Sequence, residues 1–74
     1  MKIDFTGHGL ERLKERGISK KEAQEAFERG KKEDAEGGLR KSTHRNSKGT
    51  LVVIYNIKSS KEVGIITAYR DLNN

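Results

Sequence analysis

The chain has 74 residues and a mass of 8.3 kDa, with 31% hydrophobic residues, 36% charged residues and a formal net charge of +5. A chain this short buries only about 60% of the surface that its unfolded form exposes, so residues 1–74 can form a single small domain but not a large enzyme core. The absence of Cys excludes disulfides and thiolate chemistry, and no stretch approaches the roughly 20 apolar residues of a membrane-spanning helix, so no membrane span is expected.

The N-terminus predicts a short strand followed by a helix. Residues 1–5 alternate apolar and polar side chains, which is the period of a half-buried strand. Thr6 offers a hydroxyl for a helix N-cap, and residues 7–16 are expected to be helical. Gly17 then ends this helix as a residue able to adopt positive φ.

A second short helix is predicted to follow. Ser19 and Glu22 have the spacing of a capping box, in which each side chain satisfies a free backbone N–H of the other residue. The apolar residues then follow at helical spacing, and Gly30 is expected to end the helix with positive φ, as Gly17 does. Each helix is too short to be stable alone, so both must pack on the rest of the domain.

The second half of the sequence predicts a sheet. Residues 31–38 are polar and end in glycine, which is typical of a loop. Residues 39–45, 50–58 and 62–70 have the period of strands, and their short connections make them an antiparallel meander. We therefore predict an α+β fold of order β-α-α-β-β-β, with two N-terminal helices packed on a three- or four-stranded antiparallel sheet.

Most of the core must come from the last two strands, because they hold eleven of the hydrophobic residues. These are Leu51, Val52, Val53, Ile54, Tyr55, Ile57, Val63, Ile65, Ile66, Ala68 and Tyr69.

The positive charge is concentrated in one segment. Residues 37–61 hold six basic residues and no acidic one, whereas the charges of the preceding residues cancel. This layout favours a polyanionic partner such as RNA. The alternative is an ordinary surplus of solvated surface charges. The six residues are Arg40, Lys41, Arg45, Lys48, Lys58 and Lys61.

No cofactor or metal ion is expected. The only two histidines are 36 positions apart, and neither has a carboxylate pair at helical spacing. No glycine-rich phosphate loop is present either, because the pair Gly37 and Gly38 neither follows a strand nor opens a helix.

The first helix carries a stripe of residues that could contact an anion. His8, Arg12 and Arg16 are four positions apart, so they lie along one side of the helix. His8 faces away from the apolar pair Leu10 and Leu13, and Arg16 borders this pair. Ion pairing on the helix surface is the alternative reading of the two arginines.

The predicted strands add further polar groups. Arg40, Ser42 and His44 share one face of their strand, and Lys41, Thr43 and Arg45 share the other. In the last strand, Thr67 and Tyr69 share a face. The alternative for His44 is an incidental position on the surface. The alternative for the tyrosines is packing in the core.

This set of side chains suits RNA cleavage without a metal ion. The attacking 2′-OH must lose a proton and the leaving 5′-oxygen must gain one, while negative charge gathers on the oxygens of the phosphorane. Imidazoles serve the proton transfers, arginines stabilise the charge, and a tyrosine stacks on a base or donates a proton. The candidate catalytic residues are His8, Arg12, His44, Arg45, Thr67 and Tyr69, and the candidate RNA-binding residues are Arg16, Arg40, Lys41, Lys48, Lys58 and Lys61.

The sequence also resembles a family of small bacterial toxins. The pattern His-x-x-x-Arg-x-x-x-Arg-Gly-Ile-Ser at residues 8–19, with a closing Thr-x-Tyr at residues 67–69, is similar to proteins related to RelE and BrnT. These belong to the wider barnase, EndoU, colicin and RelE group of metal-independent ribonucleases, which includes toxin domains of contact-dependent inhibition effectors.

The resemblance implies a two-helix, antiparallel-sheet nuclease whose substrate lies on the open sheet face. It matches His8 and Arg12 in the helix and Thr67 and Tyr69 in the closing strand; His44 and Arg45 rest on the chemical argument alone. The expected function is an endoribonuclease toxin that cuts tRNA or mRNA to 2′,3′-cyclic phosphate ends. It would act in the cytoplasm, whether made there or delivered from a larger secreted effector, and an acidic antitoxin or immunity protein would neutralise it.

Two alternatives use the same charges without catalysis. One is a basic RNA-binding module, and the other is an interaction domain for an acidic partner protein. The nuclease and both alternatives predict that binding to the acidic partner weakens as salt increases. Only the nuclease predicts cleavage products.

Overall fold

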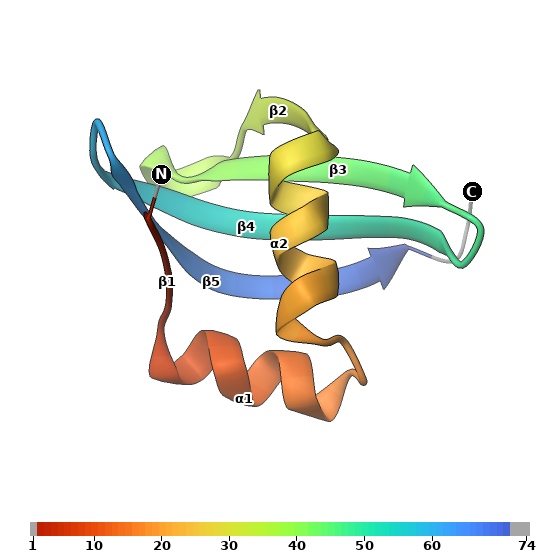
Figure 1. Cartoon of the computed structure of the whole chain (residues 1–74). Helices are drawn as coiled ribbons and strands as arrows, with labels where there is room; N and C mark the ends of the chain where they lie inside the picture. Colours follow the sequence, from red (N-terminus) through yellow and green to blue (C-terminus); the bar gives the residue numbers. More distant parts are fainter. Residues whose placement is uncertain (1, 72–74) are drawn as a thin grey trace.

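The computed structural model describes residues 2–71 and contains two helices and five strands (Figure 1). Met1, which the sequence placed in the first strand, lies outside the described residues. The elements are β1 (Lys2–Phe5), α1 (Gly7–Glu15), α2 (Lys20–Arg29), β2 (Lys31–Asp34), a short 3-10 turn (Glu36–Gly38), β3 (Arg40–Asn46), β4 (Gly49–Ser59) and β5 (Glu62–Asp71).

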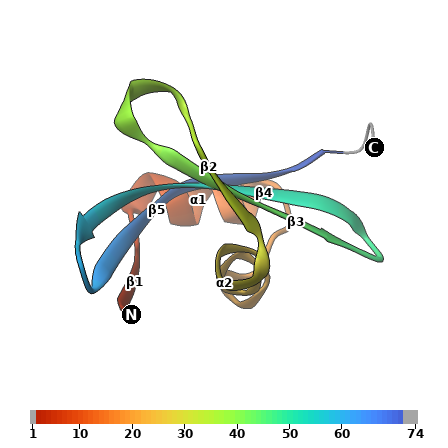
Figure 2. The same ribbon diagram turned by 90° about the horizontal axis from the view of Figure 1, so that it is seen from above.

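The strands form one mixed sheet in the order β1-β5-β4-β3-β2. All neighbours are antiparallel except β1 and β5, which are parallel. Helix α2 crosses one face of β3 and β4, whereas α1 packs along β5 (Figures 1 and 2). The two helices therefore contact different parts of the sheet.

The α+β class and the β3-β4-β5 meander are confirmed, but the expected three- or four-stranded antiparallel sheet is wrong in two respects. Residues 31–34 form the edge strand β2 instead of a loop, paired from Lys31 with Thr43 to Asp34 with Arg40. All four side chains of β2 are exposed, so this strand has no apolar alternation to reveal it. Strand β1 also joins the sheet in parallel, through a pairing with the distant C-terminal strand.

The predicted helix starts are confirmed. Thr6 Oγ1 accepts a hydrogen bond of 2.9 Å from Gly9 N, and Ser19 and Glu22 form the complete capping box. These bonds satisfy backbone N–H groups that would otherwise have no partner at the helix N-termini.

The two glycines at the helix ends have different roles. Gly17 has a φ of 67°, as expected, but Gly30 has a φ of −75° and extended geometry, so its predicted positive φ is wrong. The chain passes from Gly30 directly into β2. A side chain there would clash, because a Cβ would contact the Ser42 hydroxyl and lie 2.5 Å from the Ala26 carbonyl oxygen. Gly30 is thus required by close packing of α2 on β3.

The core lies between the sheet and the helices. Phe27 of α2 packs edge-on against Tyr55 of β4, with ring centroids 4.9 Å apart. Three residues assigned to apolar clusters from the sequence lie outside it, because Ile57 is 57% exposed, Tyr69 is 39% exposed and Leu10 is 36% exposed. The buried cluster comprises Leu13, Ile18, Ala23, Ala26, Phe27, Leu51, Val53, Tyr55, Val63, Ile65 and Ala68.

The strand pairings assign each side chain to a face. Ser42 donates a 2.6 Å hydrogen bond to the Ala26 carbonyl of α2, so Ser42 and its same-parity neighbours face this helix. The opposite face, called the open face below, carries Lys41, Thr43, Arg45, Val52, Ile54, Thr67 and Tyr69. Within residues 2–71, neither helix has the length and apolar character needed to cross a membrane.

Candidate functional site

A cleft of about 380 Å³ lies where α1 meets the open face of β5. Four of the six candidate catalytic residues and one candidate RNA-binding residue line it together. The lining residues are His8, Arg12, Arg16, Ile66, Thr67 and Tyr69.

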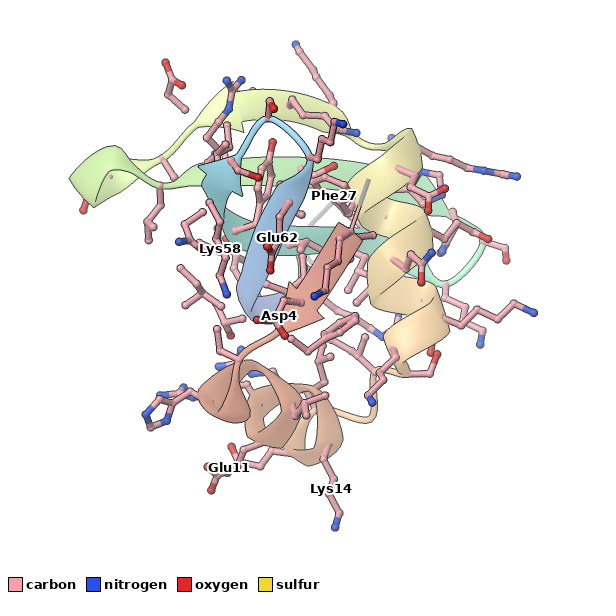
Figure 3. The ribbon with its side chains drawn as sticks, turned by 60° about the vertical axis from the view of Figure 1, so that its left-hand side comes forward. Asp4, Glu11, Lys14, Phe27, Lys58 and Glu62 are labelled. Carbon is pink, nitrogen blue, oxygen red and sulfur yellow. The ribbon has the colours of Figure 1, made fainter. Side chains whose placement is uncertain are left out.

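Helix α1 supplies one wall through its polar stripe. Gly9 and Leu13 are buried and hold the helix against the sheet, and a Cβ on Gly9 would lie 2.5 Å from the Ile65 carbonyl oxygen. Glu11 and Lys14 point away from the sheet (Figure 3). His8 and the two arginines that follow it at four-residue spacing are exposed between these sides, so they line the cleft.

Strand β5 supplies the other wall. Ala68 is fully buried, while its neighbours Thr67 and Tyr69 point to the open face, and Tyr69 is 39% exposed. The register of β4 and β5 shifts here, because Ile54 pairs with Thr67 but the next residue of β4 pairs with Ile65. Ile66 is the extra residue of this bulge and lies in the cleft. The sequence pattern assigned Ile66 to the core and did not predict this bulge.

Arg16 joins the two walls. Its Nη1 donates a 3.0 Å hydrogen bond to Thr67 Oγ1 and a 2.9 Å hydrogen bond to the Ala68 carbonyl oxygen. Because Arg16 is the C-cap of α1, these bonds fix the end of the helix on β5.

The sequence matches the model of one protein family, described as a domain of unknown function (DUF4258), over residues 5–70. The chain belongs to the DUF4258 family. The matched segment includes every residue that lines the cleft. No curated protein and no solved structure matches the chain.

The structure of this DUF4258 domain does not bring His44 to the cleft. His44 faces α2, and its Nε2 lies 3.8 Å from Glu25 Oε1. The structure therefore does not place His44 beside His8 as a proton-transfer partner, because the two imidazoles lie on different sides of the sheet.

Arg45 is on the open face but outside the cleft. It is exposed in β3 and pairs with Thr50 of β4, which in turn pairs with Asp71 of β5. Two strand spacings, or about 10 Å, separate β3 from β5. Arg45 can therefore extend a binding surface from the cleft, but it does not line the cleft.

The six basic residues of segment 37–61 do not form one patch. Lys41 and Arg45 share the open face, whereas Arg40 has the opposite parity and lies 3.9 Å from Asp34. The remaining lysines are divided between the two ends of β4: Lys48 is in the β3-β4 turn, and Lys58 and Lys61 are at the β4-β5 turn (Figure 1).

Lys58 has a partner that the sequence did not reveal. Its Nζ donates a 2.7 Å hydrogen bond to Asp4 Oδ2 of β1, which lies on the other side of β5 (Figure 3). This bond lowers the pKa of Asp4 and raises the pKa of Lys58. Gly64 leaves the space for it, since a Cβ there would lie 2.9 Å from Lys58 Cε. A glycine inside an apolar strand was the available signal.

The chemistry available in the cleft is that of an imidazole, two guanidiniums, a hydroxyl and a phenol. Among residues 2–71, no three His, Asp or Glu side chains come together as ligands for a metal ion. These groups together can bind an anion and exchange protons with it.

Proposed function

We propose that this DUF4258 domain is a metal-independent endoribonuclease that cleaves RNA to a 2′,3′-cyclic phosphate and a 5′-OH. The observation that supports this proposal is the convergence of His8, Arg12, Arg16, Thr67 and Tyr69 on one cleft. The cleft pairs anion-binding groups with proton-transfer groups, which is what attack of a 2′-OH on its own phosphate requires.

In the proposed reaction, His8 accepts the proton of the 2′-OH as the 2′-oxygen forms its bond to phosphorus. The bond from phosphorus to the 5′-oxygen breaks, and Tyr69 donates the proton that this oxygen needs. Tyr69 takes this role because His44 lies on the opposite side of the sheet. Arg12 balances the charge that gathers on the phosphoryl oxygens.

The resemblance of residues 8–19 and 67–69 to proteins related to RelE and BrnT supports the same class of reaction. On this proposal the domain is a toxin of the bacterial cytoplasm. An acidic antitoxin or immunity protein would bind over the cleft, since that position places its carboxylates beside Arg12 and Arg16 and blocks RNA.

The second candidate is a non-catalytic RNA-binding module. It is favoured by the presence of one imidazole, not two, in the cleft. In this case Tyr69, which is 39% exposed, would serve only to stack on a base.

A cleavage assay in EDTA separates the two candidates. Purified protein is incubated with tRNA and with ribosome-bound mRNA, and the product ends are analysed. The nuclease predicts 2′,3′-cyclic phosphate ends that disappear in a His8→Gln variant. Binding of RNA by the parent without any product would contradict the nuclease and support the binding module.

A further inference from the structure

The hydrogen bonds of Arg16 leave one particular edge of its guanidinium available. Both bonds to β5, to Thr67 Oγ1 at 3.0 Å and to the Ala68 carbonyl at 2.9 Å, come from Nη1. A guanidinium has five N–H donors, and the Nε–H and one Nη2–H are parallel along one edge. Within residues 2–71, neither Nε nor Nη2 of Arg16 has a hydrogen-bond partner.

This edge can bind a phosphate or a carboxylate through two parallel hydrogen bonds. Arg16 is exposed and lines the cleft, so a ligand can reach it. An exposed arginine ordinarily loses side-chain entropy when it binds an anion. Here β5 already holds the guanidinium, so part of that entropy is lost on folding instead of on binding.

The position of Arg16 along the helix assigns the phosphate that it contacts. Arg12 follows His8 by four residues and Arg16 follows Arg12 by four, so each step is about 6 Å along the axis. This step is close to the separation of successive phosphates in an extended RNA strand. A strand running along α1 would therefore present one phosphate to Arg12, with the attacking 2′-OH at His8, and the next phosphate to Arg16.

We infer that Arg16 is a preoriented phosphate ligand, whose Nε–Nη2 edge binds the phosphate adjacent to the one held by Arg12. The inference rests on the proposed function in that it takes RNA as the ligand of the cleft. It goes further in defining the substrate as a single strand with at least two consecutive phosphates.

The test uses a non-cleavable 2′-O-methyl RNA pentamer of mixed base sequence. Each phosphate in turn is replaced by an uncharged methylphosphonate, and binding is followed by fluorescence anisotropy at low salt. The parent protein should lose affinity on the order of tenfold at the phosphate that Arg16 binds. Arg16→Ala should become insensitive to replacement at that position only, and Arg12→Ala at the adjacent position.

Two further variants separate this role from a purely structural one. Lys14→Ala removes the same charge from a side of α1 that points away from the sheet, so it should keep the sensitivity of the parent at every position (Figure 3). Thr67→Val removes one hydrogen-bond acceptor of Nη1 but keeps the Arg16 charge. Replacing the phosphate that Arg16 binds should therefore cost this variant less affinity than it costs the parent. Circular dichroism establishes that each variant is folded.

The outcomes distinguish this inference from the proposed function. Equal sensitivity of Arg16→Ala and the parent at all positions would overturn the inference, even if the parent cleaves unmodified RNA. The expected pattern without any cleavage would support the inference and contradict the nuclease. If the parent binds no pentamer, both proposals fail. If Arg16→Ala is unfolded, the Thr67→Val variant decides. The inference is overturned if Thr67→Val still loses as much affinity as the parent when the phosphate assigned to Arg16 is replaced.

Discussion

Lys58 reaches across β5 to Asp4, and the 2.7 Å hydrogen bond between Nζ and Oδ2 joins β4 to the edge strand β1. A second charged contact joins α2 to the sheet, because Arg70 Nη2 lies 2.5 Å from Glu22 Oε2. Each bond lowers the pKa of its carboxyl group below the ordinary value, which is 3.8 for Asp4 and 4.5 for Glu22.

These lowered pKa values predict a loss of stability in acid. The folded carboxylates hold their protons less tightly than the unfolded chain does, so their contribution is complete above the ordinary pKa values and is lost as pH falls through the folded ones. We expect the free energy of unfolding to decrease between about pH 5 and pH 2. Urea unfolding at a series of pH values measures this decrease.

Single substitutions can assign the loss of stability in acid to the Asp4–Lys58 and Glu22–Arg70 pairs. Asp4→Asn and Lys58→Met remove the same bond, so each should flatten the pH dependence by a similar amount and the double variant should add little. Glu22→Gln should flatten it independently. A pH dependence that stays as steep as the parent's in all of these variants would contradict the assignment.

The two helix-end glycines should differ in their tolerance of a side chain. Gly17→Ala meets nothing within 4 Å and costs only the strain of its positive φ, about 1 kcal/mol. Gly30→Ala places its methyl group against the Ser42 hydroxyl and the Ala26 carbonyl, which also disturbs their hydrogen bond. We expect it to cost about 3 kcal/mol. Thermal and urea unfolding measure both, and equal costs would be inconsistent with this packing.

The two histidines should have unequal effects on cleavage. An acid-base residue contributes typically about 10²- to 10⁴-fold in rate, so His8→Gln should lose activity on that order while binding RNA nearly as well as the parent. His44→Gln is the matched control, and it should cleave at the rate of the parent because His44 faces Glu25. Single-turnover rates and affinities are measured for both, and the opposite ranking would assign the proton transfer to His44.

The basic residues should contribute unequally to the salt dependence of RNA binding. Lys41 and Arg45 lie on the open face, and each phosphate contact that Lys41→Ala or Arg45→Ala removes should lower the slope of log affinity against log salt by about 0.7. Lys58→Met should change it less, since Asp4 already holds that ammonium group. A titration between low and moderate salt measures each slope, and a larger change for Lys58→Met would indicate that RNA displaces Asp4.

Features set by neighbouring residues were predictable from the sequence. The capping box of Ser19 and Glu22, the positive φ of Gly17 and the stripe from His8 to Arg16 each depend on side chains within one or two helical turns. The β3-β4-β5 meander follows equally from alternating residues and short turns.

Other features depend on contacts between distant residues. The pairing of β1 with β5 joins residues 60 positions apart, and the Thr6 hydroxyl bond to the Ile65 carbonyl joins residues 59 positions apart. Strand β2 is charged throughout, so only its ladder with β3 identifies it. In the sequence Gly30 has the position of an ordinary helix C-cap, and only the structure shows that Ser42 packs against it.

The placement of His44 shows why the site itself was only partly predictable. The period of β3 separates Ser42 and His44 from Lys41 and Arg45, but both sets are polar, so hydrophobicity does not reveal which set faces the helices. The docking of α2, through the Ser42 bond to Ala26, decides it. That contact turns His44 toward Glu25 and leaves Arg45 on the side of the cleft. Burial of the apolar face of β4 under α2 is the physical reason, because it sets the orientation of every residue in the adjacent strand.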